Sequence, residues 1–285
     1  MITRSALVTP GRAVSRRLLA VAALAGALAL SGCGVLGIGT GDELSTEPPP
    51  PAEQLYAEGL ASLDAGRTGD AIKAFEDIDR YYPGSDYARR AMVMSGFASF
   101  ESRDYDSAID ATERFLTLYP THPDADYALF ILGQSYLRQI PDVTRDQEAA
   151  RRAMATMEEL IARFPNSEYV PEAQTTLIAV RDQLAGQEMQ VGRYYLERRE
   201  YIAAINRFQT VVAIYQDTRH VEEALYRLTE ANLAMGLLSE AQTAAAVLGH
   251  NFPGSSWYQR AFNLLAEVGA QPAENRNSDI SQAFN

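Results

Sequence analysis

The chain has 285 residues and a formal net charge of −12 at pH 7, because 37 acidic side chains outnumber 25 basic ones. This acidic balance argues against nucleic acid as a partner, since phosphates are recognised by a basic surface. It also argues against electrostatic adhesion to anionic lipids. Apolar residues make up 47% of the chain. Alanine is abundant and β-branched runs are scarce, so we expect a helical protein.

Residues 1–32 predict a lipoprotein signal peptide. Four arginines and no acidic residue precede an apolar run at 18–30, which is too short to span a bilayer comfortably. The next residues, Leu30-Ser31-Gly32-Cys33, resemble a bacterial lipobox, whose cysteine becomes the first mature residue and carries the lipid. Cys33 is the only cysteine, so it has no partner for an intramolecular disulfide. The alternative is a buried core cysteine, but a core residue has no reason to follow an apolar leader.

Residues 33–52 and 269–285 flank the periodic part of the chain. The first segment is rich in Gly, Thr and Pro, and predicts a tether that stiffens at Pro48 to Pro51. The second is polar and predicts a disordered tail. In lipoproteins an Asp after the lipidated cysteine favours retention in the inner membrane. Gly34 at that position therefore implies a lipid anchor on the periplasmic face of the outer membrane.

Residues 53–268 contain five copies of one phrase built around small residues. In the first two copies, a glycine is followed after twelve residues by an alanine and after twelve more by a proline. The sets are Gly59, Ala71 and Pro83; Gly96, Ala108 and Pro120; Gly133, Ala153 and Pro165; Gly192, Ala204 and Gln216; and Thr229, Ala241 and Pro253. A chance match would rarely keep the alanine in all five copies, so we interpret the phrase as an internal repeat.

The repeat predicts a helical hairpin. Its glycine and alanine lie on successive helices, where small side chains let the helices approach closely, and its proline ends the second helix. One hairpin cannot bury its apolar faces alone, so the hairpins are expected to stack into a superhelix. The conserved small residues resemble the tetratricopeptide repeat. The predicted fold is therefore all-α, a solenoid of five tetratricopeptide-like hairpins with a capping helix that starts at Ser255 or Ser256.

Three features depart from the ideal repeat. The residue seven positions past the alanine is large in every copy, which predicts wider packing between repeats. The stretch QIPDVTRDQ is inserted between the two helices of the third copy. A long continuous helix is expected at 171–200, with Pro171 in its first turn.

The sequence predicts no catalytic, cofactor or metal site. The histidines are His122, His220 and His250, and each falls near a turn of a different repeat, whereas a metal needs convergent ligands. A Gly-rich phosphate loop and the HExxH and GxSxG motifs do not occur. We therefore expect a binding protein rather than an enzyme.

The first helices of stacked hairpins form a concave surface, which predicts a peptide-binding groove. In tetratricopeptide proteins the groove-facing residues lie off the packing stripe. Carried onto this chain, they are Tyr56, Leu60, Arg90, Val93, Phe97, Phe100, Tyr127, Phe130 and Gln134. Aromatic side chains and arginine are common binding anchors, so we expect an extended apolar peptide with its carboxylate near Arg90. The alternative for each ring is packing against the next repeat.

The lipobox, the Pro-rich tether and the five repeats together resemble the BamD family of outer-membrane protein assembly factors. Local phrases carry the resemblance too: AIKAFEDIDRYYPGSDYA, RDQEAARRAMATMEELIARFPNSEY and GRYYLERREYIAAINRFQTVV. The resemblance implies a complex built on an integral outer-membrane barrel subunit with periplasmic domains, joined in some bacteria by other assembly lipoproteins. It also implies help in inserting β-barrel proteins, whose unfolded chains meet the N-terminal repeats through a C-terminal aromatic strand.

The same resemblance implies that the C-terminal repeats dock on the barrel subunit. Arg207 matches a family arginine tied to that docking, and Tyr194, Tyr195 and Arg198 are its expected neighbours on the adjacent helix. Gln216 stands where the family has Pro, so the sequence does not define where the preceding helix ends. The alternative is a repeat lipoprotein of another class, a secretin pilot or a peptidoglycan-synthesis scaffold, which should lack the RDQ insertion and the long helix.

Overall fold

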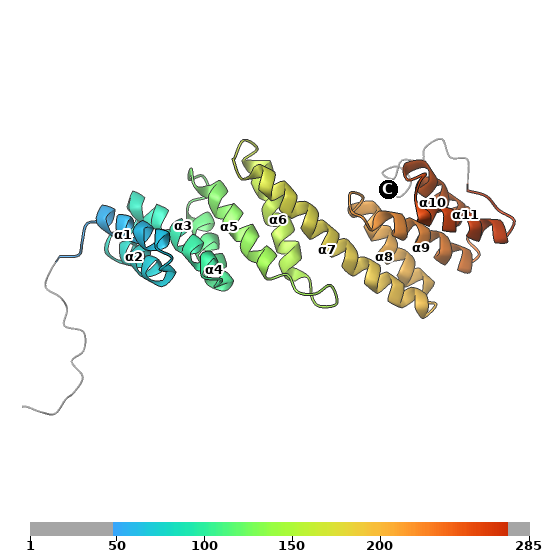
Figure 1. The fold of residues 1–285 in the computed structure, drawn as a ribbon, viewed down its shortest axis with the longest axis horizontal. Coiled ribbons are helices and arrows are strands. Elements are labelled where there is room, and N and C mark those ends of the chain that lie inside the picture. The colour runs from blue at the N-terminus through green and yellow to red at the C-terminus, as the bar shows by residue number, and fades with distance from the viewer. Residues whose placement is uncertain (1–47, 273–285) are drawn as a thin grey trace, which may run out of the picture. The chain divides into compact units, whose positions relative to one another are not determined.

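The computed structural model describes residues 48–272, and within this range it forms eleven helices and no strand (Figure 1). The helices are α1 (Ala52–Asp64), α2 (Thr68–Tyr81), α3 (Asp86–Glu101), α4 (Tyr105–Leu118), α5 (Ala125–Arg138), α6 (Glu148–Arg163), α7 (Val170–Glu197), α8 (Tyr201–Ile214), α9 (Val221–Ala234), α10 (Leu238–Asn251) and α11 (Ser256–Glu267). The predicted all-helical class is confirmed. The predicted signal peptide, Cys33 and most of the tether and tail lie outside the described residues.

The first ten helices pair in chain order into five hairpins, as the repeat predicts. The helix α11 packs on both α9 and α10, as a capping helix should. First helices of neighbouring hairpins also touch, because α3 contacts both α1 and α5, and α5 contacts α7. Within residues 48–272 the second helices α2, α4, α6 and α8 make no comparable contact with one another. Each second helix instead packs extensively on the first helix of the next hairpin, as α2 does on α3, so these contacts do not show the wider packing expected between repeats.

Small residues let each hairpin close. The five repeat alanines, Ala71, Ala108, Ala153, Ala204 and Ala241, are all completely buried. In the first, third and fourth hairpins the repeat glycine faces a large side chain from the second helix. A Cβ on Gly59 would lie 2.4 Å from a carbon of the Phe75 ring, and one on Gly192 would lie 2.5 Å from the Phe208 ring. Real side chains do not pack so closely, so the glycine allows the ring to fill the seam between the two helices.

The helix α8 ends without the proline found in the other repeats. Three side chains hold its last carbonyl groups instead. Arg181 of α7 donates to the Ile214 carbonyl at 2.6 Å, Gln216 donates to the Ala213 carbonyl at 3.3 Å, and the Thr218 hydroxyl donates to the Tyr215 carbonyl at 2.8 Å. Because the last carbonyls of a helix have no partner within it, these bonds stabilise the end of α8 at Ile214.

The insertion at 139–147 is a loop between α5 and α6, as predicted, and Gln147 holds it in place. The Gln147 amide is completely buried and donates to the carbonyls of Asp142 at 2.9 Å and Arg145 at 3.1 Å. Gln183 of α7 donates to the Gln147 side chain at 3.3 Å and to the Pro141 carbonyl at 3.0 Å. The loop is therefore fastened to α7 by hydrogen bonds that leave no polar atom of Gln147 buried without a partner.

The long helix is confirmed as α7, which spans Val170–Glu197 where 171–200 was expected. It ends earlier because Arg199 adopts a left-handed backbone conformation with φ of 62°, which turns the chain into α8. Glycines take the same conformation in the turns of the first and fifth hairpins, at Gly66 and Gly236. An arginine there costs about 1–2 kcal/mol more than a glycine would.

His220 gives the fold a specific sensitivity to acid. Its ring lies beside Gly186 of α7, and its Nε2 is 3.7 Å from a carboxylate oxygen of Asp182. Burial lowers the pKa of His220 below its ordinary value, and Asp182 offsets only part of that effect. The folded state therefore favours the neutral ring. As the pH falls below about 6.5, the unfolded chain gains a proton more readily than the folded one, so this group reduces stability.

We expect His220→Gln to lose less stability than the parent chain between pH 7.5 and pH 5.5. The amide keeps a polar side chain beside Asp182 but does not titrate. Urea unfolding at both pH values measures the difference. Equal pH dependence in the His220 variant and the parent chain would contradict this account.

Candidate functional site

A pocket on the first helices brings together four of the nine predicted groove residues. Its volume is about 270 Å³, and α1, α3 and α5 contribute to its lining. The predicted residues in it are Tyr56, Arg90, Val93 and Tyr127, and they are joined by Met94 and Asp124. We call these six residues the groove pocket. Sequence reasoning missed Met94 and Asp124, because neither follows the spacing carried over from tetratricopeptide proteins.

Arg90 is the cationic group of the groove pocket. Its side chain is exposed and has no ion pair or hydrogen bond with any residue in the range 48–272. The Tyr56 ring lies 5.7 Å from both the Phe75 and Tyr87 rings. Burial raises the pKa of the Tyr56 hydroxyl, and the nearby Arg90 charge works in the opposite direction. The pocket therefore offers a guanidinium group beside apolar and aromatic walls, which suits a carboxylate attached to an apolar chain.

An aromatic cluster continues the surface from the groove pocket. The Phe97 ring centroid is 6.1 Å from that of Tyr127. Tyr169, at the start of α7, stacks on Tyr127 at 5.1 Å and on Phe130 at 4.9 Å. Burial strongly raises the pKa of the Tyr127 hydroxyl, so this ring is neutral at any physiological pH. Sequence reasoning missed Tyr169, because it precedes a helix and so falls outside the repeat pattern.

The remaining predicted groove residues are placed differently. Gln134 is 6% exposed, and its amide donates to the Thr176 hydroxyl of α7 at 3.1 Å, so it joins two repeats. The Phe100 ring packs against Tyr105 at 5.7 Å. Leu60 is 37% exposed on α1. In the structure, Phe130 and Gln134 therefore contact the next repeat.

The residues expected to dock a partner lie on α7 and α8. Arg207 of α8 pairs with Glu188 of α7 at 3.1 Å. Tyr194 is 54% exposed and its ring lies 5.3 Å from the Arg198 guanidinium carbon. Tyr195 is half-buried, because it packs against the large core cluster of the C-terminal hairpins. Tyr195 is seven positions after Glu188 on α7, so the partner of Arg207 lies about two helical turns from the tyrosine pair.

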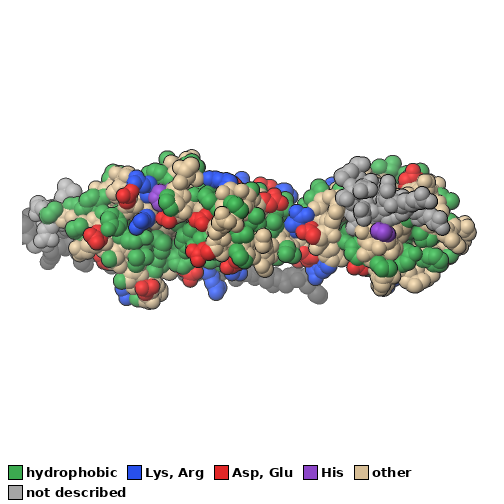
Figure 2. All heavy atoms as spheres, turned by 90° about the horizontal axis from the view of Figure 1, so that it is seen from above, with side chains coloured by type: hydrophobic (Ala, Val, Ile, Leu, Met, Phe, Trp, Pro, Cys, Tyr) green, Lys and Arg blue, Asp and Glu red, His purple; other side chains and the backbone are tan. Residues whose placement is uncertain are grey.

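An apolar hollow is lined by Arg199 and Asn206, the sequence neighbours of Arg198 and Arg207. It has a volume of about 530 Å³ and lies at the turn between α7 and α8, where it includes Arg199 and Glu200. Ile202 and Met235 supply most of its apolar character, with exposed fractions of 66% and 38%. We call Tyr194, Arg198, Arg207 and this hollow the docking surface. Figure 2 shows one face of the molecule, on which apolar side chains reach the surface between interspersed positive and negative charges.

The described residues contain no group of three or more His, Cys, Asp and Glu side chains placed to hold a metal ion. His122 lies 3.7 Å from Asp124, and His220 lies in a different hairpin beside Asp182. Within residues 48–272, no helix combines the length and the apolar character that crossing a membrane requires.

Comparison with known proteins identifies the family. The family model YfiO, described as an outer membrane lipoprotein, matches residues 48–248. Three relatives carry the name outer membrane protein assembly factor BamD. The protein of Caulobacter vibrioides is 43% identical over 78% of this chain and 73% of its own length. That of Rickettsia prowazekii is 37% identical over 75% and 86%, and that of Neisseria meningitidis serogroup A is 37% identical over 82% and 91%. The chain therefore belongs to the BamD family of outer membrane protein assembly factors.

Proposed function

We propose that this chain is a non-catalytic scaffold that helps to assemble β-barrel proteins in the outer membrane. The observation that carries the proposal is the groove pocket, where the uncompensated Arg90 guanidinium lies among aromatic rings in a member of the BamD family. An unfolded barrel protein ends in an apolar, aromatic strand with a free carboxylate. The carboxylate of such a terminus can pair with Arg90, while Asp124 of the same pocket lies 3.7 Å from His122. The apolar side chains of the terminus suit the tyrosine rings of the pocket.

The docking surface supports a second contact, with an integral outer-membrane barrel subunit that has periplasmic domains. Exposed Tyr194 and Ile202 supply apolar area, while Arg198 and Arg207 supply charge. Aromatic residues and arginine are enriched among the anchors of protein interfaces. Lipid on Cys33 would hold the scaffold at the periplasmic face of the outer membrane. Other assembly lipoproteins are further candidate partners.

A tagged purification tests this function. The chain with a C-terminal tag is purified from mildly solubilised membranes, and mass spectrometry identifies the proteins that accompany it in near-stoichiometric amount. A barrel protein with periplasmic domains supports the proposal. A secretin or a cell-wall synthase without any barrel subunit would favour the pilot or scaffold alternative instead. The same spectra would show whether the N-terminal peptide starts at a lipid-modified Cys33.

Arg207→Glu is expected to reduce the recovered barrel subunit about tenfold, a loss of about 1.4 kcal/mol of binding free energy. The new carboxylate would face Glu188 and would replace an exposed positive charge with a negative one. Quantitative mass spectrometry of the tagged complex measures the loss. Arg138→Glu is the matched control, since Arg138 is exposed on α5, outside the docking surface. An unchanged amount of barrel subunit with Arg207→Glu would contradict the assigned docking role.

Arg90→Ala is expected to weaken binding of a peptide with an aromatic last residue about tenfold. The probe is a synthetic β-strand peptide with a free carboxylate, and its amidated form serves as the second ligand. Fluorescence anisotropy measures both affinities. If Arg90 holds the carboxylate, amidation should weaken binding to the parent chain but make no further difference in the variant. If both chains distinguish the free from the amidated peptide equally well, Arg90 does not bind the carboxylate.

A further inference from the structure

The first hairpin binds a short segment that precedes it in the chain. Residues 48–51 are four prolines that lead directly into α1. Proline fixes its own φ and has no backbone N–H, so such a segment is stiff and can form backbone hydrogen bonds only through its carbonyl groups. A donor that holds the segment must therefore come from elsewhere in the fold. We call residues 48–51 the proline strap.

One side chain at the end of α2 supplies that donor. The Tyr82 hydroxyl lies 2.9 Å from the Pro50 carbonyl oxygen and 3.2 Å from that of Pro49. Because a hydroxyl has one hydrogen, the two carbonyls share it in a three-centre bond. The Pro51 carbonyl accepts the first bond of α1 from the Leu55 backbone at 3.1 Å. Three consecutive carbonyl groups of the strap are thus bound.

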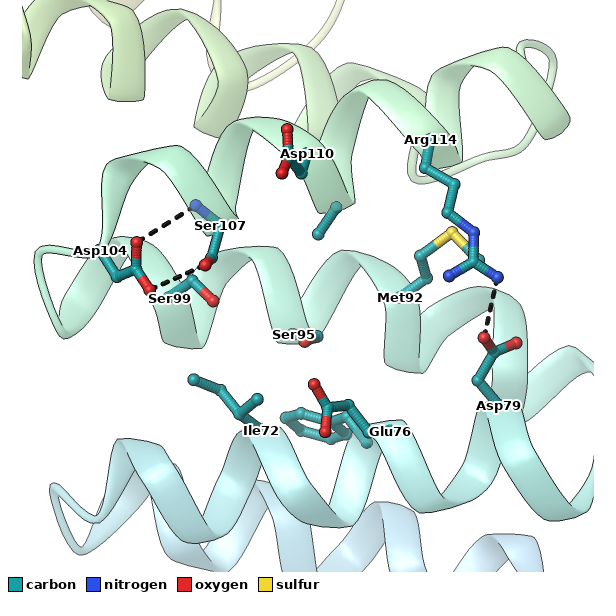
Figure 3. A pocket seen from close by; sticks show the side chains of 12 residues that line it. Ile72, Glu76, Asp79, Met92, Ser95, Ser99, Asp104, Ser107, Asp110 and Arg114 are labelled. Carbon is teal, nitrogen blue, oxygen red and sulfur yellow. Dashed lines mark hydrogen bonds and ion pairs between the residues drawn. The ribbon is translucent and has the colours of Figure 1, made fainter.

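The end of α2 is a firm anchor for Tyr82. The Tyr82 backbone donates to the Ile78 carbonyl at 2.9 Å, and the Tyr82 carbonyl accepts from the Ser85 backbone at 3.2 Å. Asp79, on the last turn of α2, pairs with Arg114 of α4 at 2.9 Å (Figure 3). The strap is therefore bound to a residue whose own position is fixed by α2 and by the helix of the next hairpin.

The core beneath the strap also supports the groove pocket. Partly buried Ala52, Tyr56 and Tyr82 pack on one core cluster of α1, α2 and α3, together with Met94. Tyr56 and Met94 are also walls of the groove pocket. Side chains that share a close-packed cluster transmit displacements to one another. The strap and one side of the groove pocket therefore rest on the same packed unit.

We propose that Tyr82 is a positioning residue that fastens the proline strap to the packed unit behind the groove pocket. The chain then reaches α1 along one fixed path. A displacement of the chain before residue 48 acts on the cluster of Tyr56 and Met94, because the strap cannot swing away from α2. Without the hydroxyl, the bond from Leu55 would be the remaining hold on the strap. The inference does not rest on the proposed barrel-assembly function, since its test needs neither a peptide nor a partner.

Tyr82→Phe tests the strap, because it removes the hydroxyl and keeps the ring. Nuclear magnetic resonance of the full chain in detergent, with isotope-labelled proline, reports the isomers of the two peptide bonds whose carbonyls Tyr82 binds. A fastened bond before proline holds one isomer, whereas a free segment exchanges between two. We expect one set of resonances for each of Pro50 and Pro51 in the parent chain. In Tyr82→Phe a second set of about 5–30% should appear.

Tyr81→Phe is the matched control, since it removes a hydroxyl from the neighbouring ring, which is 45% exposed. A second measurement tests the link to the groove pocket. The methyl resonance of Met94 should move in Tyr82→Phe, while that of Met189, in the core of the C-terminal hairpins, should not. Circular dichroism and the thermal midpoint show that each variant is folded. Three results would overturn the proposal: single proline resonances in Tyr82→Phe, the same second set in Tyr81→Phe, or an unmoved Met94 methyl.

Discussion

Gly192→Ala is expected to destabilise the protein by about 1–3 kcal/mol, although alanine is the better helix former. The added Cβ would lie 2.5 Å from one carbon of the Phe208 ring and 2.9 Å from two others. Phe208 is completely buried in the largest core cluster, so its rigid ring cannot move without displacing its neighbours. Urea unfolding followed by far-UV circular dichroism measures the loss.

Gly133→Ala is the matched control for this prediction. Its Cβ would also lie 2.5 Å from a neighbour, but that atom is the terminal methyl of Met157, which can rotate away. We therefore expect a clearly smaller loss of stability from Gly133→Ala. Combining Gly192→Ala with Phe208→Leu should recover part of the loss, because the smaller side chain makes room for the methyl group. Equal losses of stability in Gly192→Ala and Gly133→Ala would show that the rigidity of the Phe208 ring does not determine the cost.

Phe115→Ala is expected to cost about 3–5 kcal/mol, the usual range for removing a buried aromatic side chain. Phe115 is completely buried in a small core cluster with Met92 and Ile131, which join it from the neighbouring first helices. Its ring also meets the His122 ring edge-on at 5.4 Å. Because repeats depend mainly on their nearest neighbours, the damage should be local.

Hydrogen exchange with mass spectrometry can locate that damage. Amides of residues 86–138 should exchange much faster in Phe115→Ala, while those of residues 201–251 should change little. Leu118→Ala on the same helix is the control, since Leu118 is 52% exposed and should cost less than about 0.5 kcal/mol. Uniform acceleration along the chain would mean that the five hairpins unfold as one cooperative unit.

The sequence was sufficient to predict the hairpins, because the repeat places small residues where helices must touch. The fifth copy shows the physical rule behind the pattern. Thr229 replaces the glycine there, and Ala245 stands where the first and fourth copies have phenylalanine. Both residues are completely buried. In this copy the larger side chain on one helix is compensated by a smaller one on the other.

The ends of helices and the contacts between repeats were harder to predict. Because Gln216 replaces the expected proline, the sequence did not show where α8 ends. In the structure Arg181, 33 positions before Ile214, donates a hydrogen bond to the Ile214 carbonyl, a contact that the sequence could not reveal. Helical spacing indicates which side chains share a face, and four of the expected groove residues do line one pocket; their role in peptide binding stays a prediction. Tyr169 and Glu188 were missed, since their roles depend on how one hairpin meets the next. The spacing of residues within one repeat carries no information on the contacts between neighbouring hairpins.

The helix α7 belongs to two cores at once, and this gives it a mechanical role. Ala173 near its start is part of the cluster around Leu129, while Met189 near its end belongs to the cluster around Phe208. At 1.5 Å per residue its 28 residues form a rod about 42 Å long. Tyr169 at one end stacks on the groove aromatics, and Tyr194 lies at the other end in the docking surface. If a partner docks at Tyr194 as proposed, a tilt of α7 at that end would also move Tyr169 and with it the aromatic cluster proposed to bind a peptide.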